Sequence, residues 1–304
     1  MKTDNKKKLH KLIALGVSFT ASLALTSIYA QTARAASFLV DFETDAAGNP
    51  LASGIDIGEQ WADIGVHISA TPDTNRLRDL ESQLESQRET LETQSERLER
   101  EREGRNRQGR INRIQRRIDR AQNEIEALEQ DIDNERGNFP LRLFNSNCGP
   151  DFGVACTGGD DDLATGDTFG TEAQGNVLII NESRNGEPDD FAGGGTLVFE
   201  FDMEVTLDSI TLLDIDENRG ASLNVFDAFG ETLATVSGLS SGGDNGLLQH
   251  LFDDLSGISR LEVTLPGSGA IASIGFTSSQ TCFKPEVAPG GSKDWADACE
   301  AAHF

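Results

Sequence analysis

Residues 111–132 read INRIQRRIDRAQNEIEALEQDI, and an apolar residue recurs in this stretch at alternating steps of three and four. The segment before it repeats the spacing at Leu77, Leu80, Leu84, Leu91 and Leu98, with Gln87 and Gln94 at two of the seam positions. Such heptads are typical of a coiled coil, and the glycine-bounded segment 104–109 allows the chain to reverse. We therefore predict an antiparallel coiled-coil helical hairpin over residues 75–137. The alternative, a disordered charged linker, is disfavoured by the unbroken apolar seam at Ile111, Ile114, Ile118, Ala121, Ile125, Leu128 and Ile132.

On both sides of this hairpin the apolar residues recur with a period of two. SFLVDFE at 37–43 and IGVHISA at 64–70 alternate apolar and polar residues. After residue 138, nine further strand segments are separated by short turns rich in Gly, Asp or Asn, and no helical pattern lies between them. The predicted strands are 139–145, 176–182, 195–201, 205–214, 222–227, 232–237, 247–252, 260–265 and 270–276. This pattern predicts a mainly β, jelly-roll-like antiparallel β-sandwich over 36–74 and 138–278, with the hairpin inserted.

The first 35 residues have the pattern of an export signal of bacterial type. Lysines precede an apolar run that starts at Leu12, and the small-residue box Ala33-Arg34-Ala35 closes the segment. A retained membrane anchor is the alternative reading of the apolar run. We expect an exported protein, in the periplasm, at the cell surface or outside the cell, with no membrane span after signal removal.

Four cysteines follow the signal and fall into two local pairs. Four cysteines allow three pairings, and the short loops favour Cys148 with Cys156 and Cys282 with Cys299. In an oxidising compartment these pairs are structural disulfides. A zinc site is the weaker reading, because the spacings do not fit and histidine is scarce. Residues 279–304 are therefore predicted to form a disulfide-stapled tail.

The charge is distributed unevenly along the chain, whose formal net charge is −25. Residues 76–136 contain 14 arginines and 16 acidic residues, a net charge of −2. The rest of the chain after the signal has six basic and 34 acidic residues, a net charge of −28. A body this acidic repels nucleic acid and anionic membranes, so neither is an expected partner.

Carboxylates are the chemical groups that the sequence offers in number. They gather at the ends of predicted strands and in loops, where hard oxygen donors suit Ca²⁺. The candidate calcium ligands are Asp41, Glu43, Asp160, Asp161, Asp162, Asp214 and Asp216, and further acidic groups stand at 181–182 and 189–190. None of these clusters has the EF-hand spacing, and a solvated acidic surface is the alternative.

Enzymatic patterns are weak in this sequence. The two-glutamate pattern of some β-sandwich glycosidases would fall on Asp214, Asp216 and Arg219, which puts a cation in place of the second glutamate. The histidines after the signal are dispersed, and most of the 16 phenylalanines occupy strand positions typical of a core. We therefore expect a non-enzymatic protein that contacts a protein or an acidic glycan at the cell surface or matrix, or a second copy through the hairpin. A calcium-dependent carbohydrate-binding module and, less favoured, a polysaccharide hydrolase with a carboxylate pair are the alternatives.

Several motifs occur in a familiar order along the predicted strands. They are DFETDAAGNP at 41–50, GGDDDLAT at 158–165, NVLIINE at 176–182, PDD at 188–190, GGGT at 193–196 and LLDIDE at 212–217. In these motifs the chain resembles the exported β-sandwich domains of bacterial PEP-CTERM proteins and their cyanobacterial relatives. The resemblance implies an extracellular or matrix-associated jelly-roll domain. The chain departs from this group in lacking the C-terminal sorting tail and in carrying the coiled coil.

Overall fold

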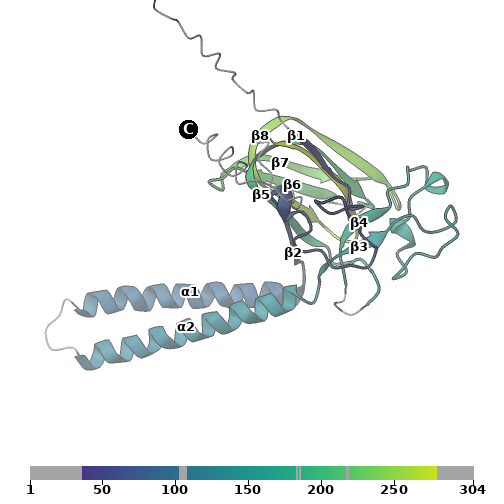
Figure 1. The fold of residues 1–304 in the computed structure, drawn as a ribbon. Helices are drawn as coiled ribbons and strands as arrows, with labels where there is room; N and C mark the ends of the chain where they lie inside the picture. Colours follow the sequence, from purple (N-terminus) through teal and green to yellow (C-terminus); the bar gives the residue numbers. More distant parts are fainter. Residues whose placement is uncertain (1–35, 103–107, 183, 185, 217–218, 279–304) are drawn as a thin grey trace, which may run out of the picture. The chain divides into compact units, whose positions relative to one another are not determined.

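The computed structural model describes residues 36–102, 108–182, 184, 186–216 and 219–278 (Figure 1). The predicted signal and the predicted Cys282–Cys299 tail lie outside these residues. The described chain is mainly antiparallel β-sheet with two long helices, and neither helix is long and apolar enough to cross a bilayer. The strands are β1 (Ala36–Val40), β2 (Val66–Pro72), β3 (Leu141–Asn145), β4 (Asn176–Ile180), β5 (Gly195–Leu213), β6 (Ala221–Phe226), β7 (Thr232–Leu239), β8 (Leu247–Leu265) and β9 (Ala270–Ser278), and the helices are α1 (Asn75–Arg102) and α2 (Gln108–Arg136).

The sheet order is β3-β4-β9-β5-β8-β6-β7, with β1 also paired to β9 and β2 to β5. The long strand β5 explains how this sheet encloses a core. Its first residue, Gly195, pairs with Leu265, and its last, Leu213, pairs with Ala270. Since Leu265 and Ala270 flank one short turn, both ends of β5 lie at the same edge of the fold. A straight strand of 19 residues would span about 60 Å, so β5 bends back, and its register shifts between Glu200 and Ser209 supply the bend.

The main hydrophobic core lies between the two layers that this bend creates. Leu197, Phe199 and Leu207 of β5 are fully buried in it. The other strands contribute further apolar residues to the same cluster, with those of β7 only partly buried. This is the packing of a β-sandwich. The finer jelly-roll connectivity stays a prediction.

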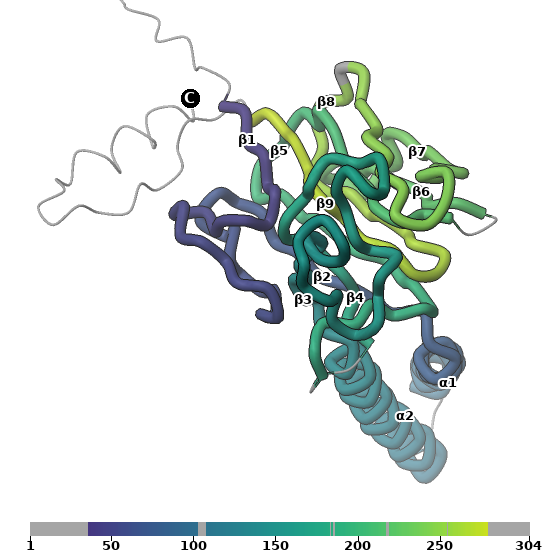
Figure 2. The backbone as a smooth tube through the Cα atoms, turned by 90° about the vertical axis from the view of Figure 1, so that its right-hand side faces the viewer, coloured from purple at the N-terminus to yellow at the C-terminus, as the bar shows by residue number. Residues whose placement is uncertain are grey.

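A second, smaller core lies where the loop 146–175 packs on the strands (Figure 2). Phe144, Val177 and Ile179 from the strands meet Leu163 and Ala164 from the loop, and all five are fully buried. The predicted disulfide between Cys148 and Cys156 is confirmed and closes the start of this loop. The loop therefore has a fixed place in the fold and holds residues 160–162 against the sandwich.

The two helices pack side by side in opposite directions and form apolar clusters of their own (Figure 1). One cluster joins Leu77, Leu80 and Leu84 to Ile132, and the other joins Leu98 to Ile114 and Ile118. Along α1, Gln87 lies between the two clusters, and Gln94 lies within the second one, between Leu91 and Leu98. The helical hairpin connects β2 to β3. These two strands do not pair with each other, because β2 pairs with β5 and β3 pairs with β4.

Candidate functional site

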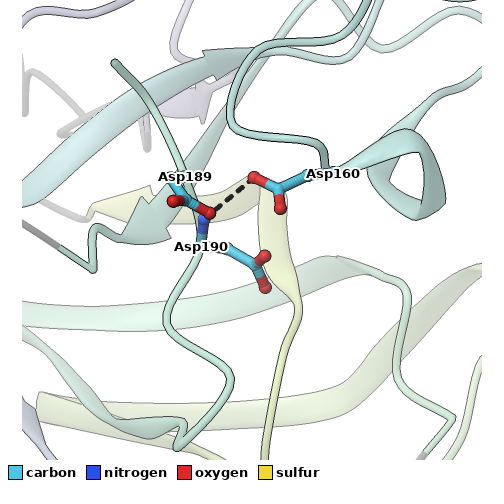
Figure 3. Close-up of side chains that lie close together, drawn as sticks. All are labelled: Asp160, Asp189 and Asp190. Atoms are coloured by element: carbon cyan, nitrogen blue, oxygen red, sulfur yellow. Dashed lines mark hydrogen bonds between the residues drawn. The ribbon is translucent and has the colours of Figure 1, made fainter. Parts of the chain in front are cut away.

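Five aspartates from three parts of the chain meet beside the turn between β8 and β9. We call Asp160, Asp162, Asp189, Asp190 and Asp214 the acidic cluster. One carboxylate oxygen from each of Asp160, Asp189 and Asp190 lies within 4.8 Å of the others (Figure 3). The backbone N–H of Asp190 donates to Oδ2 of Asp160 at 2.9 Å. The loop 146–175 is thereby tied to the segment that precedes β5.

The bend of β5 explains why these residues converge. Asp190 lies shortly before β5 and Asp214 directly after it, and both ends of the strand reach the turn that contains Ser268. The Ser268 hydroxyl donates to Asp190 Oδ2 at 2.5 Å and lies 3.4 Å from Asp214 Oδ2. The backbone N–H of Gly269 also donates to Asp190 Oδ2, at 2.9 Å. The register of β5 against β8 and β9 thus brings residues that are far apart in sequence together in the cluster.

Asn245 fixes the other side of the cluster. Its backbone N–H donates to Asp214 Oδ1 at 3.1 Å, and its side-chain amide donates to the carbonyls of Asp161 and Ala164 at 2.7 and 2.9 Å. Asp214 has a φ of 58° and Asn245 a φ of 59°, in the left-handed region where Asp and Asn are the non-glycine residues most often found. The left-handed backbone at these two residues therefore directs the chain after β5, and the turn before β8, toward the cluster.

Few positive charges lie near the acidic cluster to compensate its carboxylates. Asp190 is 8% exposed and Asp214 only 2%. In the described part of the chain, no basic side chain forms an ion pair with any of the five aspartates, and residues 36–278 contain no lysine. Oδ1 of Asp162 is buried and accepts no hydrogen bond from the described residues. A buried carboxylate oxygen without a donor is costly unless a proton or a cation reaches it.

Burial raises the pKa of several of these carboxyls, because ionisation is disfavoured away from water. Burial, together with the neighbouring Asp190 and Asp189 carboxylates, raises the pKa of Asp160 to about 8. Burial, followed by the charge of Asp162, raises the pKa of Asp214 to about 7. The pKa of Asp162 is also raised, by burial and then by Asp190. Without a cation, the cluster therefore retains protons near neutral pH.

The structure places the seven predicted ligands in different surroundings. Asp160, Asp162 and Asp214 lie in the cluster, whereas the side chains of Asp161 and Asp216 are exposed. Asp41 and Glu43 lie elsewhere: Glu43 Oε1 accepts the backbone N–H of Asn176 at 2.6 Å, and Asp41 Oδ1 accepts that of Glu43 at 3.1 Å. Asp189 and Asp190, which the sequence offered only as a loop pair, complete the group.

A groove of about 630 Å³ opens beside the cluster. Asp161, Asp162 and Asp244 line it together with Asn245 and the ring of Phe169. The groove joins carboxylates to one aromatic residue, a combination that suits a polar ligand with an apolar side.

No protein-family model and no curated protein sequence matches the chain. Among solved structures, a mutant of the lectin binding domain of Lectinolysin complexed with Lewis b is similar at 14% identity, over 34% of this chain and 71% of that one, with a TM-score of 0.25. A fucose binding module of Streptococcus pneumoniae is 10% identical over 30% and 68% of the two chains, with a TM-score of 0.22. A carbohydrate binding module from Cellvibrio mixtus lichenase 5A, in complex with cellotriose, is 16% identical over 34% and 78%, with a TM-score of 0.21. These similarities carry no argument about the ligand of this chain, and the resemblance to PEP-CTERM domains stays a prediction.

Proposed function

We propose that this chain is an exported, non-enzymatic interaction protein, with a calcium-stabilised β-sandwich as its body and the coiled-coil hairpin as its contact arm. The observation that carries this proposal is the separation of the apolar cores. The main core draws its residues from the sandwich, whereas both clusters of the hairpin draw theirs from α1 and α2. An element that does not complete the core of its host is free to serve a partner.

Calcium is the cation that suits the acidic cluster. The three nearest carboxylates offer hard oxygen donors within 4.8 Å of one another, and Asp162 adds a buried oxygen without a donor. A divalent cation would replace the protons that the raised pKa values imply. It would also cross-link the loop 146–175 to both ends of β5, so its expected role is structural.

A non-enzymatic role and export are supported by two observations. Asp214, the first residue of the glycosidase-like pattern, is 2% exposed and hydrogen-bonded to Asn245, so a polysaccharide has no access to it. The Cys148–Cys156 disulfide agrees with folding in an oxidising compartment outside the cytoplasm.

Replacing residues 75–137 with a short Gly/Ser linker is expected to leave a folded sandwich. Thr74 Oγ1 donates to Glu135 Oε1 at 3.1 Å, so the two ends of the hairpin lie together and a short linker can join them. The deletion removes both hairpin clusters and leaves the main core complete. Circular dichroism should show loss of the helical signal, and urea titration should give a cooperative transition within about 1 kcal/mol of that of the intact chain.

An unfolded or molten product would contradict the division into body and arm. A matched control inserts the same linker in place of residues 103–107 only, between the two helices. This variant should retain both the helical signal and the sandwich transition, which separates the effect of the linker from that of losing the helices.

Calcium-dependent carbohydrate binding is the second candidate, and the groove beside the acidic cluster favours it. Phe169 supplies an aromatic face there, and Asp161 and Asp244 supply polar contacts. We expect binding on a glycan array in millimolar calcium, abolished by EDTA and by Phe169→Ala. An array without signal in calcium would count against this candidate and leave the contact-arm proposal intact.

A further inference from the structure

The two sides of the hairpin differ in how the helices are bridged. On one side, Arg88 pairs with Glu129 at 3.0 Å and Arg136 pairs with Glu81 at 3.2 Å. We call this the braced side. A groove of about 380 Å³ lies on this side. The opposite side, which we call the open side, contains a groove of about 350 Å³. Ion pairs bridge the open side only near its two ends, where Arg76 pairs with Glu135 at 3.4 Å and Arg110 pairs with Glu101 at 3.8 Å. The groove is lined by Gln83, Ser86, Gln87, Glu124, Ala127, Leu128 and Asp131.

The hairpin is nearly neutral as a whole, but its positive and negative charges are separated along its length. The distal part, residues 97–120, contains ten arginines and four acidic residues, a net charge of +6. The proximal parts, 76–96 and 121–136, contain four arginines and 12 acidic residues, a net charge of −8. The helices are about 40 Å long, so the centres of the two adjoining regions lie about 20 Å apart, which exceeds the Debye length of about 10 Å. Each region therefore acts on a partner separately.

The same separation runs along the open side. Arg110, Arg113, Arg117 and Arg120 follow one another at steps of three and four and so share one line along α2. Steps of four, three and four continue this line through Glu124, Ala127 and Asp131, which line the open groove. Arg97 and Arg100 occupy the corresponding positions of distal α1. Asp79 and Arg76 occupy those near its start, where the charge of Arg76 is compensated by its ion pair with Glu135. Within the described residues, Arg113, Arg117 and Arg120 form no ion pair.

The seam between the two helices contains apolar residues that are only partly buried, and one of them, Leu128, lines the open groove. Leu91, Ile111, Ile125 and Leu128 of the seam are only partly buried. The side-chain oxygen of Gln94, between Leu91 and Leu98 of the distal cluster, is buried and accepts no hydrogen bond from the described residues. In a two-helix pair, a seam with these gaps is completed when further helices pack against it, and polar seam residues commonly specify the number of helices and the register.

We propose that the open sides of two hairpins pack against each other in opposite directions, tip to base, to form a four-helix bundle. The distal arginines of one copy then face Glu124 and Asp131 of the second copy, and the reverse contact is the same by two-fold symmetry. Arginine fits this contact because its guanidinium bonds carboxylates in a bidentate manner. Packing in the same direction would instead oppose like charges and bring the two acidic bodies together. Antiparallel packing keeps the bodies at opposite ends, beyond the screening length.

This inference rests on the proposed role of the hairpin as a contact arm and names a second copy as its partner. The test uses the chain from residue 36 onward, with mass measured by light scattering after gel filtration. We expect the unsubstituted chain to be a dimer that dissociates as the salt concentration rises. The distal variant Arg113→Glu, Arg117→Glu and Arg120→Glu should be monomeric. The proximal variant Asp79→Arg, Glu124→Arg and Asp131→Arg should be monomeric as well.

Mixing the two variants decides the arrangement. At one contact the acidic tip of the distal variant meets the basic base of the proximal variant, and at the other the unchanged acidic base of the distal variant meets the unchanged arginine tip of the proximal variant. An equimolar mixture should therefore regain the dimer mass. The braced-side variant Glu85→Arg, Glu126→Arg and Asp133→Arg makes the same charge change elsewhere and should stay dimeric. Circular dichroism at 222 nm should show equal helix content for all four proteins.

Three outcomes would overturn the inference. The first is a monomeric unsubstituted chain, and the second is a mixture that does not regain the dimer mass. The third is a proximal variant that still associates, because this would place the arginine tip on the acidic body of the second copy. None of these outcomes affects the division into body and arm, which fails only if deletion of residues 75–137 unfolds the sandwich.

Discussion

Without divalent cations, the free energy of unfolding is expected to fall by about 3 kcal/mol between about pH 5 and about pH 8 from Asp214 alone. In the unfolded chain this carboxyl has a pKa near 3.9, whereas burial raises the pKa to about 7 in the folded protein. A raised carboxyl pKa means that the folded state binds the proton more tightly. Stability is therefore greatest below the unfolded pKa, falls as the pH rises toward the folded pKa, and levels off above it. Asp160, with its pKa raised to about 8, acts in the same direction. Urea titrations in EDTA at several pH values measure this slope.

Asp214→Asn is the matched variant for this prediction. The amide oxygen still accepts the Asn245 N–H, and asparagine tolerates the φ of 58°. Near pH 8 in EDTA the variant should be more stable than the unsubstituted chain, although it changes a buried, hydrogen-bonded residue. The pKa of His67 is raised by its hydrogen bond to Glu59, which adds a slope of the same sign that this substitution leaves in place. An unchanged pH slope in the variant would show that Asp214 ionises normally in the folded protein.

The periodicity of the sequence predicted where strands occur better than it predicted where each strand begins and ends. Residues 195–201 and 205–214 were predicted as two strands, although Phe201, Met203 and Val205 keep the apolar period of two through Asp202 and Glu204. In the structure the backbone stays extended through them as part of β5, and the backbone N–H of Asp202 donates to the Gly65 carbonyl. The unbroken alternation of apolar and polar residues agrees with this single strand, and the predicted gap between the two strands was wrong. β8 likewise joins two predicted strands.

The acidic cluster could be predicted only in part, because its members meet through strand register. Asp160 and Asp162 were candidates as members of an acidic run, but Asp161 between them is exposed. Asp190 and Asp214 come together because Gly195 pairs with Leu265 and Leu213 with Ala270. That register depends on where β5 bends, and the sequence does not show the bend. The sequence offered one signal for this meeting: Asp189 and Asp190 come shortly before the segment 195–213, and Asp214 and Asp216 come directly after it.

Calcium at 100 times its dissociation constant is expected to raise the free energy of unfolding by about 2.7 kcal/mol. For a body of this size, each kcal/mol raises the melting temperature by about 2–4 °C, so a shift of about 5–10 °C should appear in scanning calorimetry near pH 8. The reason is that a cation bound by Asp160, Asp189 and Asp190 offsets the repulsion between three carboxylates that lie close together and have no basic partner among the described residues.

Two Asp→Asn substitutions, one inside the acidic cluster and one outside it, distinguish calcium binding at the cluster from binding elsewhere on this acidic chain. Asp190→Asn should abolish the calcium shift, while its amide oxygen can still accept from Ser268 and Gly269. Asp41→Asn removes the same charge outside the cluster and should keep the shift. An unchanged melting temperature in calcium, or an equal loss in both variants, would contradict the site.

Protons and calcium compete for the same oxygens, so the calcium shift should itself depend on pH. At about pH 5 the raised pKa values keep Asp160 and Asp214 protonated, and calcium must displace those protons in order to bind. The shift should therefore be small there and largest near pH 8, where the cation-free protein is least stable. A calcium shift that is equal at both pH values would place the ion on exposed carboxylates that ionise normally, outside the acidic cluster.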